Sequence, residues 1–210
     1  MCYLLTMLVS RAAFSIEDPW DVPAGCETVE LVRATDGSAP RLATRVSAMW
    51  DDDALTVVFS GSDDHVVATH REHDAPLYQE DVVEVFLAPR GGGEYFELEV
   101  SPLGTTFDAR IESPDGVRAT MRTELAWSCR DLFAAVRRID AQVETVLRIP
   151  FASLDVGTPN DGDEWRANFF RIDRHPSGDE FSAWRPTMKT PPDFHVVSAF
   201  GVLRFETRAC

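Results

Sequence analysis

Short runs of strand-forming residues recur along the chain, separated by turn-forming residues at roughly 8–12-residue intervals. The loops WDDDAL, APRGGGEY and SPDGV are rich in Asp, Gly and Pro, which favour tight turns. This pattern predicts an all-β fold, a single antiparallel β-sandwich of jelly-roll type over residues 1–210, with one helical turn at Pro150–Leu154. The predicted strands are Thr28–Arg33, Ala43–Trp50, Leu55–Ser60, Val82–Leu87, Tyr95–Val100, Thr106–Glu112, Leu132–Arg138, Val143–Ile149, Arg166–Ile172 and Ala199–Phe205.

The charge balance limits the kinds of partner. The chain carries 35 acidic and 20 basic residues, a net charge of −15. Such a chain repels phosphate backbones, which argues against nucleic acid and against anionic membrane surfaces as partners. Neutral or cationic ligands remain compatible with it. A hydrophobic content of 44% indicates a folded core.

The N-terminus contains an apolar run from Tyr3 to Val9. No basic region precedes this run, and it is too short to span a bilayer, so it is not a convincing signal peptide or transmembrane segment. We expect residues 1–15 to include a flexible N-terminal segment, with SRAAFSI (Ser10–Ile16) suited to the first strand of the fold. These features do not assign a cellular compartment.

Four cysteines are present, at positions 2, 26, 129 and 210, and none forms a CxxC pair. The spacing therefore indicates neither a zinc framework nor a dense disulfide scaffold. Spacing and usage leave a Cys26–Cys129 disulfide only as the less favoured alternative.

Two regions contain potential metal ligands. His65, His70 and His73 lie close together in sequence, but they lack the spacing of a zinc motif, and a solvated loop is the favoured interpretation. The acidic turn at Asp161 and Asp163 offers hard oxygen ligands, so any metal is expected to be structural calcium there. An ordinary turn is the alternative, and no other cofactor is predicted.

Glutamates interrupt two of the predicted strands. Strand alternation places Glu84 on one face with Val82 and Phe86, while Glu97 and Glu99 share a face of the next strand. Paired carboxylates could indicate a glycosidase, but no catalytic triad or phosphate loop accompanies them. We therefore interpret these acids as groove-lining groups rather than catalysts.

Aromatic residues divide into core and ligand candidates. Trp50 and Trp127 are predicted in the core, and the strand around Trp165 has two partly apolar faces. Trp184 lies before several prolines in an irregular stretch, which favours a surface plate that stacks on a sugar ring. A tryptophan that pins its loop to the sandwich is the alternative.

Six segments occur in the order seen in family 9-like carbohydrate-binding modules, and together they resemble that family from about Trp50 to Phe205. They are DVVEVFLAP, YFELEVSPLGTTFD, VETVLRIP, GDEWRANFFRID, the later Trp184 and FGVLRF. The resemblance implies a β-sandwich related to these modules and to haem-binding domains of the same architecture. It further implies that Glu84 bonds a sugar and that Trp184 is one stacking plate, with Tyr78 as a second.

The sequence thus predicts a non-catalytic carbohydrate-binding module. Its expected ligand residues are Glu84, Asn168, Arg171, Trp184 and Tyr78, with Glu84 at the open end of the groove, paired with Arg171. A buried Glu84–arginine pair without a ligand is the alternative interpretation of this position. Two other functions stay open: a glycoside hydrolase, and a haem-binding electron-transfer domain. The latter would need axial ligands such as Met121, Met188 or His195.

Overall fold

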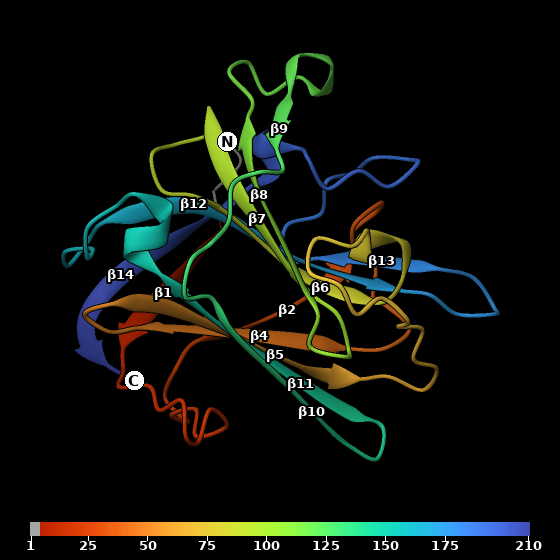
Figure 1. The fold of residues 1–210 in the computed structure, drawn as a ribbon, viewed down its shortest axis with the longest axis horizontal. Coiled ribbons are helices and arrows are strands. Elements are labelled where there is room, and N and C mark those ends of the chain that lie inside the picture. Colours follow the sequence, from red (N-terminus) through yellow and green to blue (C-terminus); the bar gives the residue numbers. More distant parts are fainter. Residues whose placement is uncertain (1–4) are drawn as a thin grey trace.

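The computed structural model describes residues 5–210, and β-strands dominate it (Figure 1). The described strands are β1 (Thr6–Arg11), β2 (Thr28–Glu30), β3 (Val32–Arg33), β4 (Thr44–Trp50), β5 (Ala54–Ser62), β6 (Val82–Ala88), β7 (Glu94–Val100), β8 (Thr106–Glu112), β9 (Arg122–Glu124), β10 (Phe133–Ile139), β11 (Gln142–Pro150), β12 (Glu164–Asp173), β13 (Glu180–Ala183) and β14 (Gly201–Ala209). The described helices are short 3₁₀ turns: η1 (Leu77–Gln79), η2 (Arg118–Thr120), η3 (Phe151–Leu154) and η4 (Val197–Ala199). None of these helices could cross a lipid bilayer.

The strands form two layers joined by β1. Hydrogen-bonded neighbours follow the order β10-β11-β5-β4-β1-β14-β12-β6-β7-β8-β9. Strand β1 runs parallel to β14 over most of its length and also pairs with β4 at Ser10 and Arg11, so it carries the sheet from one layer to the other. The remaining pairs on this path are antiparallel. The predicted β-sandwich is confirmed.

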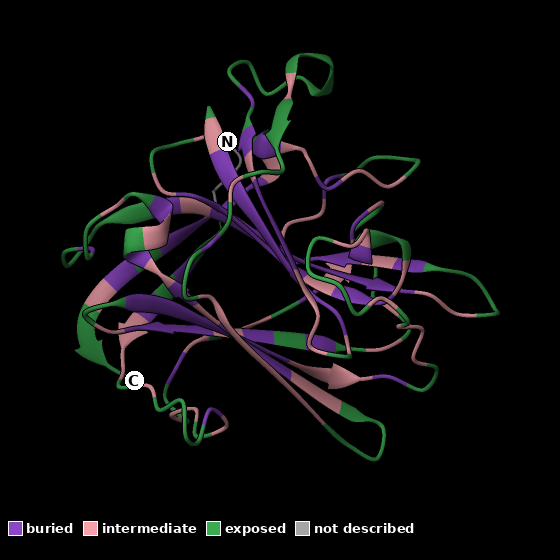
Figure 2. Ribbon diagram, in the orientation of Figure 1, coloured by how far each residue is buried: buried purple, intermediate pink, exposed green. Residues whose placement is uncertain are grey.

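The main apolar core lies between the two layers. Most residues of β5 and β6 are buried (Figure 2). Alternation along β6 directs Val85 and Leu87 inward, where they share one buried cluster with Leu55 and Val57 of β5. Trp50 and Trp165 are buried in this cluster, and Trp127 packs against its edge. The core position predicted for Trp50 is confirmed.

A second apolar cluster lies on the other face of β6, β7, β8 and β12. Phe86, Tyr95 and Phe170 point to this face and are buried there. The segment before β14 covers part of them: the ring of Phe194 stacks on Phe170 with centroids 4.2 Å apart. This outer cluster forms the base of the pocket described below.

Most predicted strands are present, with small shifts at their ends. The predicted strand Thr28–Arg33 is interrupted at Leu31, so that it forms β2 and β3. Strands β9 and β13 were not predicted, because β9 is short and exposed and β13 lies beside the proline-rich stretch. The helical turn near Pro150 is confirmed as η3.

The first strand differs from the prediction. Strand β1 begins at Thr6 rather than Ser10, and Met7 and Val9 are fully buried in the core. The Thr6–Val9 part of the apolar run therefore belongs to an interior strand, because Met7 and Val9 fit between the two layers. The predicted flexible segment is wrong for Thr6–Arg11; residues 1–4 lie outside the described part.

The Cys26–Cys129 alternative is also wrong. Cys26 pairs with Cys210, with their Cα atoms 4.6 Å apart, while Cys129 is a free thiol buried in the core. The end of β14 brings Cys210 against the Gly25–Cys26 turn, a contact between distant parts of the chain that spacing does not reveal. Cys2 lies outside the described residues.

Candidate functional site

Arg171 lies on the inner face of β12, away from Glu84. Strand register places Arg171 opposite Val83, whereas Glu84 is opposite Phe170, so the two side chains point to different faces. The Arg171 guanidinium donates to Thr44 Oγ1 at 3.0 Å and to the Ser62 carbonyl at 2.8 Å. The predicted Glu84–Arg171 pair is therefore wrong.

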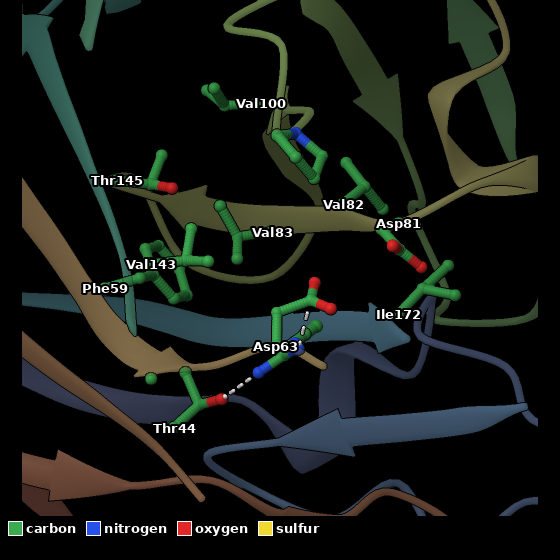
Figure 3. A pocket seen from close by; sticks show the side chains of 13 residues that line it. Thr44, Phe59, Asp63, Asp81, Val82, Val83, Val100, Val143, Thr145 and Ile172 are labelled. Atoms are coloured by element: carbon green, nitrogen blue, oxygen red, sulfur yellow. Dashed lines mark hydrogen bonds and ion pairs between the residues drawn. The ribbon is translucent and has the colours of Figure 1, made fainter. Parts of the chain in front are cut away.

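A cavity of about 40 Å³ lies next to Arg171, with Thr44 and Asp63 among its lining residues (Figure 3). The guanidinium also pairs with Asp63 at 3.5 Å and with Asp173 at 3.8 Å. A cavity of this size accommodates only a few water molecules. Arg171 is thus part of a buried ion-pair network, and its predicted ligand role does not fit this position.

Asn168 is fully buried and acts on the backbone. Its amide nitrogen donates to the Arg185 carbonyl and its amide oxygen accepts from the Arg185 N–H, both at 2.9 Å. The side chain thereby holds the stretch after β13 against β12. With these bonds made, Asn168 has no access to a ligand, and its predicted ligand role is not supported.

Trp184 is a core residue with 4% of its surface exposed. Its ring stacks on Phe169 with centroids 5.5 Å apart and lies over Gly201, where an added Cβ would come within 2.5 Å of the ring. The interpretation as a sugar plate is wrong in this geometry. Strand β13 ends at Ala183, so Trp184 enters the sandwich before the proline-rich stretch begins.

Glu84 and Tyr78 meet at a pocket on the outer face of the β6–β12 layer. The pocket has a volume of about 590 Å³, and Glu84 and Glu97 lie among its lining residues. Tyr78, on η1, is 49% exposed at this pocket, and Phe194 lines it from the stretch before β14. These two predicted ligand residues are brought together, unlike the other three.

The pocket adjoins three buried carboxyl groups. Glu84 lies directly opposite Glu99 in the β6–β7 register, with Glu97 two residues away on β7. Carboxylate oxygens of the three residues lie within 4.8 Å of one another. Burial, and next the neighbouring Glu97, raise the pKa of Glu84 well above its usual range. Burial raises the pKa of Glu97 to about 7.

Two arginines at the pocket were missed by the sequence analysis. Arg174 donates to the Tyr78 carbonyl at 2.6 Å and pairs with Asp179 at 2.7 Å, so it fixes the position of η1. Arg118 pairs with Asp193 at 3.2 Å on the opposite wall. Only Arg174 carried a sequence signal, since it follows a predicted strand next to the GDEWRANFFRID segment.

His195 and Met121 both contact the hydroxyl group of Tyr95. His195 Nδ1 lies 2.7 Å from this oxygen, and Met121 Sδ lies 3.3 Å from it. Burial, and then the charge of Arg118, lower the pKa of His195 to about 4. Met188, the third haem-ligand candidate, is on the surface with 62% exposure. These contacts do not favour axial haem ligation.

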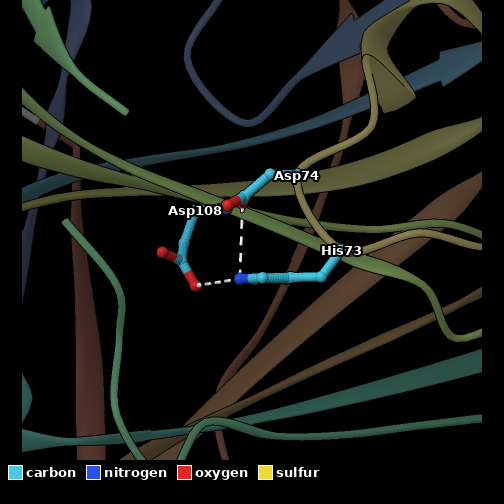
Figure 4. Close-up of side chains that lie close together, drawn as sticks. All are labelled: His73, Asp74 and Asp108. Carbon is cyan, nitrogen blue, oxygen red and sulfur yellow. Dashed lines mark hydrogen bonds and ion pairs between the residues drawn. The ribbon is translucent and has the colours of Figure 1, made fainter. Parts of the chain in front are cut away.

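The three histidines of the predicted loop do not converge. His65 packs against His175, with ring centroids 5.4 Å apart. His73 Nε2 lies 3.4 Å from Asp74 Oδ1 and 3.8 Å from Asp108 Oδ2 (Figure 4). The ring thus offers positive charge to two carboxylates when protonated.

The acidic turn expected to hold calcium is internally bonded. Asp161 Oδ1 accepts from the Thr207 N–H at 2.8 Å and from its hydroxyl at 3.0 Å, and Asp163 Oδ2 accepts from the Asn160 N–H at 2.7 Å. These two carboxylates therefore close the turn and pair it with β14. The geometry does not support calcium binding at Asp161 and Asp163.

The fold and the pocket define a class: a β-sandwich domain with an open, acid-lined pocket on one outer face. The family model for carbohydrate-binding family 9 matches residues 26–205, and the chain belongs to this family. Comparison with curated proteins gives no significant match.

Solved structures show the same fold. A carbohydrate binding module of family 9 from Caldicellulosiruptor kristjanssonii, in complex with cellotriose, has a TM-score of 0.68 at 15% identity, covering 98% of this chain and 95% of that one. Its complex with glucose has a TM-score of 0.69 at 15% identity, covering 98% and 97%. A protein from Bacteroides uniformis has a TM-score of 0.73 at 18% identity, covering 96% and 99%.

Proposed function

We propose that this protein is a non-catalytic carbohydrate-binding module that holds a mono- or oligosaccharide in the pocket beside Glu84. The main support is that buried carboxyl groups and the exposed ring of Tyr78 line the same pocket. The chain also belongs to carbohydrate-binding family 9. Structural neighbours in complex with cellotriose and with glucose support the choice of ligand class.

The pocket offers both kinds of contact that a sugar needs. An aromatic ring packs against the apolar C–H face of a sugar, and polar groups bond the hydroxyls at its edge. Tyr78 supplies the ring and Phe194 adds an apolar surface, and Glu84 and Glu97 reach the pocket from the sheet. These residues replace Asn168, Arg171 and Trp184 in the binding mechanism.

The raised pKa values of the carboxyl groups extend their hydrogen-bonding capacity. A protonated carboxyl group donates one hydrogen bond and still accepts others, whereas a carboxylate only accepts. Since burial raises the pKa of Glu84 and brings that of Glu97 to about 7, these groups can present a donor at neutral pH. A sugar hydroxyl, which both donates and accepts, matches either state.

Family 9 comprises binding modules, and we propose that this chain likewise does not cleave its ligand. Incubation with oligosaccharides and aryl glycosides, followed by product analysis, should yield no hydrolysis. Released sugar that disappears in Glu84→Gln would establish a glycosidase instead.

The binding test is a glycan-array screen followed by calorimetric titration of the best ligand, with cellotriose and glucose included. Tyr78→Ala and Glu84→Leu should each weaken binding by about tenfold or more, the effect of losing one good stacking or polar contact. Matched controls are Ile139→Ala and Glu164→Gln, which alter an exposed apolar residue and an exposed acid away from the pocket. Unchanged affinity in both pocket variants would refute the assignment.

A further inference from the structure

The three glutamates of β6 and β7 form an unusual buried cluster. Glu84, Glu97 and Glu99 all point to the outer face of the layer, and at most 7% of any of them is exposed. Like charges directly opposite each other on neighbouring strands are destabilising. Three carboxyl groups in one place therefore require a compensating group.

Glu99 shows the missing compensation most clearly. It has no exposed surface, and within residues 5–210 neither carboxylate oxygen accepts a hydrogen bond of normal geometry; its polar neighbours are the Tyr78 backbone N–H and the Glu97 carboxyl group. The nearby cationic side chains are engaged elsewhere, Arg174 with Asp179 and Arg118 with Asp193. His195 Nε2 comes only within 4.0 Å of Glu97. An unpaired carboxyl group in such a setting has a high cost.

The arrangement of oxygens suits a hard divalent cation. Ca²⁺ binds carboxylate oxygens at about 2.3–2.6 Å, so oxygens around one ion lie up to about 5 Å apart. Oxygens of the three glutamates lie within 4.8 Å of one another. Glu84 and Glu97 also line the pocket, from which water can complete the coordination shell.

We propose that Glu84, Glu97 and Glu99 bind one divalent cation of the calcium type between the sheet and the pocket. Oxygen-only ligands favour Ca²⁺, Mg²⁺ or Mn²⁺ over zinc. The cation would be held by the deprotonated form of the carboxyl groups, two of which, Glu84 and Glu97, also line the proposed sugar site, so its binding is tested without sugar.

Two other pairs of acidic residues differ from the glutamate cluster, because they have charged or hydrogen-bonding partners. Asp74 and Asp108 have the imidazole of His73 between them. Asp161 and Asp163 receive hydrogen bonds from their own turn and from β14. Each of those four carboxylates has at least one such partner, although Asp108 Oδ1 has none, whereas both oxygens of Glu99 lack a hydrogen bond of normal geometry.

The test is calorimetric titration of the full chain with CaCl₂ alone, after EDTA treatment and removal of the chelator. It is run at about pH 8, since protons compete with the metal for the carboxylates. We expect binding of one Ca²⁺ per chain and a melting temperature that rises with Ca²⁺ concentration, because the ion binds the folded state. Glu99→Gln should weaken the binding at least tenfold. Glu84→Gln is the second variant, used if Glu99→Gln does not fold.

The matched control is the double variant Asp161→Asn/Asp163→Asn, which should retain wild-type affinity for Ca²⁺. No binding up to about 1 mM, the weak limit of known calcium modules, would overturn the proposal and leave protons as the compensating groups. Equal affinity in wild type and both glutamate variants, or loss of binding only in the control, would overturn it as well. Since no sugar is present, a failed sugar titration leaves this result intact.

Discussion

Two groups of buried charged residues lie on opposite faces of the layer that contains β6, β7 and β12, and they differ in how their charge is balanced. On the inner face, Arg171 pairs with Asp63 and Asp173, and Arg41 pairs with Asp173 at 2.9 Å. On the outer face, Glu84 and Glu99 have no ion pair within residues 5–210. One layer thus carries a paired network and an unpaired cluster, separated only by strand alternation.

The contrast separates structure from function. Buried ions that are fully paired hold strands in register, and removing one partner leaves the other without compensation. Buried carboxyl groups without partners instead mark places where an external group can bind, and perturbed pKa values cluster at such sites. The inner face should therefore determine stability, and the outer face should determine binding.

Truncating the core aromatic gives the largest expected change in stability. Trp184→Ala should lower the free energy of unfolding by about 3–5 kcal/mol, because it leaves a cavity against Phe169 and Gly201. Tyr78→Ala, at the exposed pocket edge, should change it by about 0.5 kcal/mol or less. Urea unfolding of both variants measures the difference. If Trp184→Ala lowers the free energy of unfolding only slightly, Trp184 is not a core residue and becomes a candidate ligand residue again.

Removing the inner cation should have the next largest effect. Arg171→Met keeps similar volume but leaves Asp63 without its pair, and it should cost about 3 kcal/mol. This lies at the low end for a broken buried pair, because Arg41 still pairs with Asp173. Arg204→Met is the control, since its exposed pair with Glu164 should contribute less than about 1 kcal/mol. Equal losses in both variants would argue against a structural network at Arg171.

The smallest expected effect is a pH dependence from the outer cluster. Burial raises the pKa of Glu97 in the folded state from 4.5 to about 7, so the folded protein binds more protons than the unfolded chain in this window. Its contribution to stability is fully present below pH 4.5 and is lost as the pH rises through about 7. Because Glu84 and Glu99 also have raised pKa values and titrate together with Glu97, the loss is spread over a broad pH range rather than concentrated at one pKa.

The Glu97 effect is measured by urea unfolding from about pH 4 to 8 with EDTA present. Glu97→Gln should flatten the decline relative to wild type, whereas Glu164→Gln, an exposed control, should leave it unchanged. A stability that rises equally in wild type and Glu97→Gln over this range would show that Glu97 does not titrate as expected.

Several features followed directly from local sequence. Alternation in DVVEVFLAP and YFELEV predicted that Glu84, Glu97 and Glu99 would lie on faces opposite Val85 and Leu98, and the buried clusters confirm this. Family resemblance, rather than local sequence, predicted Tyr78 at the ligand site, and Tyr78 lines the pocket. Strand alternation is a property of adjacent residues, so it needs no knowledge of the rest of the fold.

Other features depended on contacts between distant segments. The sequence alone determined the strand pattern, the sandwich class and the neighbours, Val82 and Phe86, that share a face with Glu84. Only the tertiary structure decided that Arg171 bonds Ser62 and that Trp184 covers Gly201. It also decided that Cys26 pairs with Cys210. The physical reason is that each of these contacts joins positions whose proximity is fixed by sheet order and by the close packing of side chains, neither of which local spacing specifies.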